Sequence, residues 1–234
     1  MEREISNKIR FLMEEILPPL LRDSWLFASA ASLVWGKHIA NLADFRRRAV
    51  ELTSQEYESL YRAHPRVHCE TDNTEACIAR ICSDLLGESM VDVGCGTGYL
   101  VNTAKVLRHK DFRRYVGVDF IEHANPSFEF IKAPIETLPF RDAEFDTVVC
   151  THVIEHILDY RQAIAELRRI TRRRLIIVVP REREGLYTFN PHFNFFPYKH
   201  SFLRAMIPVP KTYVCEDIGR DIYYCEDILN GADE

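Results

Sequence analysis

The sequence predicts an α/β fold in which helices cover both faces of a doubly wound, mostly parallel seven-stranded sheet. From residue 71 onward, short apolar runs alternate with helical segments, which is typical of parallel sheets buried on both sides. A glycine-rich turn at 94–98 separates the first apolar run from a helical segment. The apolar spacing over 1–66 is helical instead. We therefore expect a helical N-terminal extension at 1–66 and one main domain at 67–234.

The elements of the main domain follow in order along the chain. A helix is expected after the capping-type residues at 71–74, because Ile78, Ile81 and Leu85 share one face and Gly87 can end it. Strands are expected at 89–94, 114–120, 128–134, 145–152, 174–180, 211–218 and 220–227, and further helices at 98–109 and 160–171. The last two strands are separated only by glycine and its neighbours, so they are expected to form a terminal hairpin.

Composition limits the classes of function. The net charge is -5, which does not favour nucleic acid as a partner because phosphate binding normally requires a basic face. The arginine run at 168–174 is the local exception. We expect it to be a solvated basic patch at the amino end of the sheet. Seven cysteines without C-x-x-C spacing and no signal-peptide pattern indicate reduced thiols in a cytoplasmic protein. The apolar stretch at 24–35 is too short to span a bilayer.

The glycine-rich turn indicates a ligand site. Glycine lets the backbone approach a ligand closely, and the following helix offers free N–H groups. The spacing G-x-G-x-G at 94–98 differs from the G-x-G-x-x-G of dinucleotide sites. Asp92 lies just before the turn and suits a cationic ligand group, whereas it would repel a pyrophosphate.

Several ordered motifs carry a resemblance to a known family. They are D-x-G-x-G-x-G at 92–98, VGVDF at 116–120, the stretch 135–159 and LRRITRRRLIIVVP at 167–180. Over about residues 70–180 the chain resembles the class I S-adenosylmethionine-dependent methyltransferases, and its type 11-like branch in particular. The resemblance implies the class I methyltransferase fold, S-adenosylmethionine as cofactor and S-adenosylhomocysteine as product.

The resemblance also implies a set of cofactor-binding residues. Asp92 would lie near the methionyl amino group, Asp119 would hold the ribose hydroxyls, and Ile135 would lie against adenine. Thr151 would face the cofactor near its sulfonium, above a loop formed by Gly94, Gly96 and Gly98. The family often has Gly-Asp-Ala-Glu where this chain has Ala-Pro-Ile-Glu at 133–136. Glu136, a backbone carbonyl or a water molecule could replace the missing aspartate, and these alternatives stay open.

The segment THVIEHI at 151–157 contains the candidate catalytic residues His152, Glu155 and His156, which we expect on the first turns of a helix. Three interpretations compete. The trio could orient neighbouring loops. Alternatively, His152 could act as a general base on an acceptor hydroxyl. The segment is also similar to the E-x-x-E-H trio that binds a divalent ion in some O-methyltransferases, with His192 as a further ligand. Here histidine replaces the first glutamate, which makes the site softer.

The aromatic segment 184–202 is expected to face the substrate through Tyr187, His192, Tyr198 and His200, or to dock on the N-terminal helices. The N-terminal extension is expected to act as a lid or to support a homodimer. These features favour O-methylation of a hydroxyl on a small molecule or glycan. The alternatives are a metal-assisted RNA 2'-O-methyltransferase and a non-catalytic cofactor-binding subunit.

Overall fold

The computed structural model describes residues 11–27, 29, 48–63, 70–108, 112–122, 126–186 and 191–228. The chain divides into two compact units. The first, here called the helical unit, joins residues 1–69 with residues 182–197. The second, the sheet unit, joins residues 70–181 with residues 198–234 and contains the predicted cofactor residues. Each unit is described by itself.

The helical unit contains short helices and the segment that follows the fifth strand. Pro19 starts the short helix α2, where its missing N–H is not needed. The Arg22 guanidinium donates to the backbone oxygen of Glu184 at 3.0 Å, and the rings of Tyr57 and Phe193 lie 5.9 Å apart. Part of the aromatic segment thus packs on the N-terminal helices. The bounds are Leu12–Ile16 (η1), Pro19–Arg22 (α2), Ala49–Glu51 (η2) and Ser54–Ala63 (α6).

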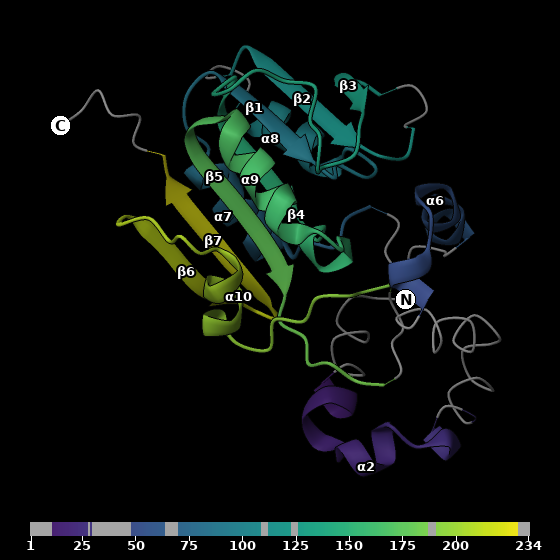
Figure 1. Cartoon of the computed structure of the whole chain (residues 1–234). Helices are drawn as coiled ribbons and strands as arrows, with labels where there is room; N and C mark the ends of the chain where they lie inside the picture. Colours follow the sequence, from purple (N-terminus) through teal and green to yellow (C-terminus); the bar gives the residue numbers. More distant parts are fainter. Residues whose placement is uncertain are drawn as a thin grey trace. The chain divides into compact units, whose positions relative to one another are not determined.

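The sheet unit contains the seven strands that the sequence predicts, in the order β3-β2-β1-β4-β5-β7-β6 (Figure 1). The first five strands are parallel, whereas β7 runs antiparallel to both of its neighbours. The predicted mostly parallel sheet and its terminal hairpin are therefore confirmed. The strands are Ser89–Val93 (β1), Arg114–Asp119 (β2), Glu129–Lys132 (β3), Phe145–Thr151 (β4), Thr171–Pro180 (β5), Tyr213–Ile218 (β6) and Asp221–Asp227 (β7).

Helices cover both faces of this sheet (Figure 1). On one face, Cys77 and Ile81 of α7 and Leu100 of α8 pack against Met90 and Val149 in a fully apolar core. α9 buries its own apolar stripe on the other face. The helices are Glu75–Asp84 (α7), Tyr99–Leu107 (α8), Ile154–His156 (η3, a single 3₁₀ turn), Tyr160–Ile170 (α9) and Lys199–Ala205 (α10). None of the helices formed by the described residues has the length and apolar character needed to cross a membrane.

The arginine run is only in part the solvated patch that the sequence suggested, because Arg172 and Arg173 are exposed and the other side chains are half-buried. Arg168 forms an ion pair of 2.7 Å with Glu226, whose side chain is buried. Arg172 reaches Asp146 at 3.1 Å, and Arg174 reaches Asp227 at 2.8 Å. These side chains fasten α9 and β5 to neighbouring strands, so most of their charge is compensated within the fold. The prediction was incomplete because a run of like charges shows nothing of the partners that lie far away in sequence.

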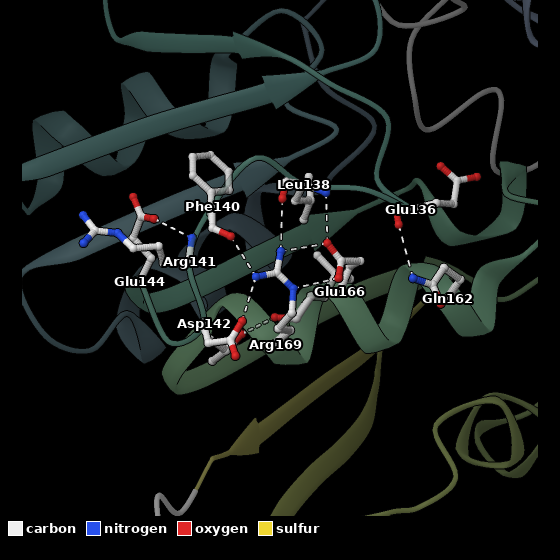
Figure 2. A network of polar contacts seen from close by, with 11 residues as sticks. Glu136, Leu138, Phe140, Arg141, Asp142, Glu144, Gln162, Glu166 and Arg169 are labelled. Atoms are coloured by element: carbon white, nitrogen blue, oxygen red, sulfur yellow. Dashed lines mark hydrogen bonds and ion pairs between the residues drawn. The ribbon is translucent and has the colours of Figure 1, made fainter.

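Arg169 holds a loop of the sheet unit in place (Figure 2). Its guanidinium donates to the backbone oxygens of Leu138 and Phe140 at 3.0 and 2.7 Å, and to both carboxylate oxygens of Glu166 at 2.7 and 2.8 Å. A further bond reaches Asp142 at 2.9 Å, so every N–H group of the guanidinium has an acceptor. Glu166 also accepts from the Leu138 N–H at 3.0 Å. The loop that follows the predicted adenine contact is therefore fixed to α9.

Candidate functional site

The glycine-rich turn joins β1 to α8 in a tight, left-handed backbone path. Gly94, Gly96 and Gly98 all have positive φ angles, which L-residues with a side chain rarely adopt. Space is limiting as well, because a Cβ at Gly94 would overlap Val153 and one at Gly98 would overlap the ring of Phe128. The backbone amides of Gly94 and Cys95 both donate to the Val118 oxygen at the end of β2. The turn is therefore a rigid cradle at the carboxyl end of the sheet.

Asp119 is the last residue of β2 and closes this cradle from the side. Its Oδ2 accepts from the Gly96 N–H at 2.9 Å, and its Oδ1 accepts from the Ile121 N–H at 2.9 Å. The carboxylate is 7% exposed. Each carboxylate oxygen can accept more than one hydrogen bond, so the side chain retains capacity for ligand hydroxyl groups. The position fits the ribose role that the resemblance implies.

Asp92 is buried inside the sheet next to the turn. Burial, together with the nearby charge of Asp119, raises the pKa of the Asp92 carboxyl to about 7. Its Oδ1 has no hydrogen-bond partner among the described residues. A buried carboxylate oxygen without a donor fits a positively charged ligand group with N–H donors.

Thr151 is the last residue of β4 and forms a hydrogen bond with Asn73, which was not among the predicted site residues. Its Oγ1 accepts from the Asn73 Nδ2 at 2.9 Å, and both side chains are buried. In the sequence, Asn73 stands among several residues that also suit a helix N-cap, and Thr74 is the residue that caps α7. Nothing local in that pattern shows a contact across the 78 residues that separate Asn73 from Thr151.

His152 follows β4 directly, but it is not on a helix as the sequence suggested. Its φ of +55° turns the chain sharply, and only Ile154–His156 form a single 3₁₀ turn before α9 begins at Tyr160. The helical prediction for the segment 151–157 is therefore wrong. The H-x-x-E-H spacing suits a helix face, yet Ile154 is drawn fully into the core and the backbone bends at His152 instead. A left-handed backbone at a residue with a side chain is often found at functional sites.

Two carboxylates flank the His152 ring. Its Nδ1 lies 3.6 Å from Glu155 Oε1, and its Nε2 lies 3.9 Å from Asp221 Oδ1. Burial lowers the pKa of His152, but the charges of Asp221 and Glu155 outweigh burial and leave that pKa above its ordinary value. Nε2 itself is buried and has no hydrogen-bond partner within the described ranges. Asp221, the first residue of β7, was also absent from the predicted site.

The structure brings the predicted cofactor residues together. β1 lies between β2 and β4, so the carboxyl ends that bear Asp92, Asp119 and Thr151 are neighbours. Ile135 is buried in the turn after β3, which is the strand next to β2. Ligands of open α/β sheets bind at such a carboxyl edge. Glu136 is half-buried, and its backbone oxygen accepts from Gln162 at 3.3 Å (Figure 2).

The predicted substrate residues are divided between the two units. Tyr198 and His200 stack on each other with ring centroids 5.1 Å apart at the start of α10. Between them, Lys199 reaches Asp217 of β6 at 3.7 Å, and β6 is three strands from β4 in the sheet. His192 belongs to the helical unit, where its Nδ1 lies 2.6 Å from Glu182 Oε2. Tyr187 lies outside the described residues.

Comparisons with known proteins agree with this geometry. Residues 91–179 match the family described as "Methyltransferase domain". An uncharacterised 37.1 kDa protein in a transposon of Streptomyces fradiae is 35% identical over 97 residues, which are 37% of this chain and 28% of that protein. A protein of Mycolicibacterium smegmatis named "Probable S-adenosylmethionine-dependent methyltransferase" is 28% identical over 165 residues, which are 68% of this chain and 62% of the relative.

A solved structure shares the fold. The crystal structure described as a SAM-dependent methyltransferase from Aquifex aeolicus superposes with a TM-score of 0.50 at 14% identity, over 72% of this chain and 97% of that one. The chain spans less than two thirds of the length of the curated relatives named above. Residues 91–179 thus match a methyltransferase-domain family, and the sheet unit has the class I methyltransferase fold, as the sequence motifs predicted.

Proposed function

We propose that the chain is an S-adenosylmethionine-dependent methyltransferase that methylates a hydroxyl group of a small molecule or a glycan. The observation that carries the cofactor assignment is the arrangement around the glycine-rich turn. Asp119 accepts from the Gly96 N–H, and the Oδ1 of buried Asp92, just before the turn, has no hydrogen-bond partner among the described residues. The first carboxylate suits ribose hydroxyls and the second suits an ammonium group. When bound, the cofactor supplies an electrophilic methyl carbon.

The choice of a hydroxyl acceptor rests on His152. A hydroxyl oxygen that attacks a methyl carbon must lose its proton, and an imidazole is suited to take it near neutral pH. Glu155 beside Nδ1 favours the tautomer that carries a proton there, which leaves the lone pair of Nε2 available. Asp221, 3.9 Å from Nε2, would stabilise the imidazolium that results. His152 would thus accept the proton, while Glu155 and Asp221 would position and stabilise its ring.

The arginine run gives little support to the RNA alternative. Arg168, Arg172 and Arg174 are engaged by carboxylates of the fold, and the net charge of the chain is -5. Phosphate contacts normally require uncompensated basic side chains. A small polar acceptor makes no such demand, so we favour it over RNA.

The experiment combines binding and turnover. Titration calorimetry with S-adenosylhomocysteine tests the cofactor, and transfer of a labelled methyl group from S-adenosylmethionine to a panel of phenols, sugars, glycans and RNA tests the acceptor. We expect cofactor binding and methylation of a hydroxyl compound that is insensitive to chelators. Transfer to RNA that falls steeply with salt, or loss of activity with a chelator, would favour the metal-assisted alternative. Cofactor binding without transfer to any acceptor would favour a non-catalytic subunit.

A further inference from the structure

The segment Glu70–Thr74, which leads into α7, is fastened to two elements of the candidate site. Thr97 of the glycine-rich turn donates through its hydroxyl to the Glu70 backbone oxygen at 2.6 Å. The side chain of Asn73 donates to Thr151 at the end of β4 at 2.9 Å. The turn follows β1, and β1 pairs with β4. The segment therefore runs past the carboxyl ends of both strands.

Strand register places Asn73 on the same face of the sheet as Asp92. Asp92 of β1 pairs with Val149 of β4, and paired residues of parallel strands point to the same face. Thr151 lies two residues beyond Val149, so its side chain points to that face as well. Helix α7 packs on this face through the core that contains Met90 and Val149. Thr151 therefore presents its partner Asn73 above the face on which Asp92 lies.

The side-chain amide of Asn73 donates through Nδ2, whereas its Oδ1 accepts no hydrogen bond from the described residues. Its side chain is 6% exposed, and Nδ2 is occupied by Thr151. Its Oδ1 is buried and has no hydrogen-bond partner in the part of the chain that the structure describes, which is also true of Asp92 Oδ1. Buried acceptors without donors are costly unless a ligand supplies them. Two such acceptors, one charged and one neutral, match a ligand group that carries several N–H donors and a positive charge.

We propose that Asn73 is a cofactor-binding residue whose Oδ1 accepts a hydrogen bond from the ammonium group of the methionyl portion of S-adenosylmethionine. The inference rests on the proposed function and adds a residue outside the motifs that suggested it. Asp92 supplies the compensating charge, and Asn73 supplies a neutral acceptor of fixed direction. Thr151 is a positioning residue here, because it acts by orienting the Asn73 amide.

The test compares ligands that differ only in the methionyl portion. Titration calorimetry is run with S-adenosylhomocysteine, with its decarboxylated analogue, which keeps the ammonium group, and with 5′-methylthioadenosine, which lacks it. We expect Asn73→Leu to lower the affinity for the first two ligands about tenfold or more, because a lost hydrogen bond to a charged group has roughly that size. The affinity for 5′-methylthioadenosine should not change. Asn73→Asp keeps an acceptor oxygen and should restore most of the binding.

A matched control separates this effect from a loss of structure. Thr147 lies at the other end of β4, where its hydroxyl bonds to the backbone of Leu86. Thr147→Val should lower the midpoint of thermal unfolding and leave all three affinities unchanged. If Asn73→Leu lowered the affinity for all three ligands equally, or for none of them, the proposal for Asn73 would be overturned while the proposed function would stand. If the wild-type chain bound none of the ligands, the proposed function itself would fail.

Discussion

The carboxylate of Asp119 holds the amide of Gly96 at 2.9 Å, so the end of β2 fixes the middle of the turn that follows β1. One residue thereby shapes the cradle and still offers oxygen atoms to a ligand. The arrangement would couple the geometry of the turn to the ribose binding that we propose for Asp119.

Replacement of Asp119 with alanine should weaken cofactor binding. We expect Asp119→Ala to cost about 1–3 kcal/mol of binding free energy for S-adenosylhomocysteine, because charged hydrogen bonds to the ribose and to the turn are both lost. Calorimetry measures this directly. Asp227→Ala is the control, since Asp227 pairs with Arg174 at the amino end of β5. Unchanged affinity in Asp119→Ala would refute the ribose assignment.

Cofactor binding should depend on pH through Asp92. Burial and the charge of Asp119 raise the pKa of Asp92 to about 7, so this carboxyl is largely protonated below that pH. A bound ammonium group favours the ionised form of Asp92, so cofactor binding below pH 7 should release a proton. As the pH rises toward 7, the affinity should therefore increase by up to about tenfold per pH unit. Calorimetry in buffers of different ionisation enthalpy measures the release. Asp92→Asn should bind more weakly and without this pH dependence.

The same pKa predicts a change in the stability of the chain without cofactor. Because the pKa of Asp92 is higher in the folded state than in the unfolded state, its contribution to stability is fully present below about pH 4 and is lost as the pH rises through about 7. Asp92→Asn removes this ionisation. It should therefore gain stability relative to the wild type at pH 8 but hardly any at pH 4, as measured by urea unfolding. An equal gain at both values would contradict the assignment.

His152 should matter for turnover and not for cofactor affinity. We expect His152→Ala to lower kcat by about 10²–10⁴-fold, as is typical when a general base is removed, and to leave S-adenosylhomocysteine binding nearly intact. His152→Gln keeps a polar side chain but cannot take a proton, so it should be equally slow. Wild-type turnover in either variant would show that His152 is not the base.

Arg169 should be important for stability. Arg169→Met removes the guanidinium donors to the backbone oxygens of Leu138 and Phe140 and to the carboxylate of Glu166, so we expect a loss of about 2–3 kcal/mol in the free energy of unfolding. Urea denaturation provides the measurement. Arg161→Met on the exposed side of the same helix should change stability by less than about 0.5 kcal/mol. Similar losses in both variants would mean that the network in Figure 2 contributes little.

The fold and the cofactor cradle could be predicted from the sequence because both depend on local patterns. Apolar runs mark the strands, and the order of the motifs places Asp92, Asp119 and Thr151 at adjacent strand ends. The contacts of Asn73 with Thr151 and of Arg168 with Glu226 could not be predicted, since they join residues 78 and 58 positions apart. The turn at His152 was missed for a related reason. The burial of Ile154, a tertiary effect, overrides the helical spacing of its neighbours.

The reversed direction of β7 has a consequence for the order in which the site is assembled during synthesis. Because β7 runs against β5, its first residue, Asp221, lies at the same edge as the ends of the parallel strands and comes within 3.9 Å of His152. Asp92, Asp119 and Thr151, the proposed cofactor residues at the strand ends, are all made by the time β4 has been synthesised, whereas the surroundings of His152 require the hairpin that the ribosome produces later. The residues of the proposed cofactor site therefore precede, in the order of synthesis, the carboxylate that completes the surroundings of the proposed base.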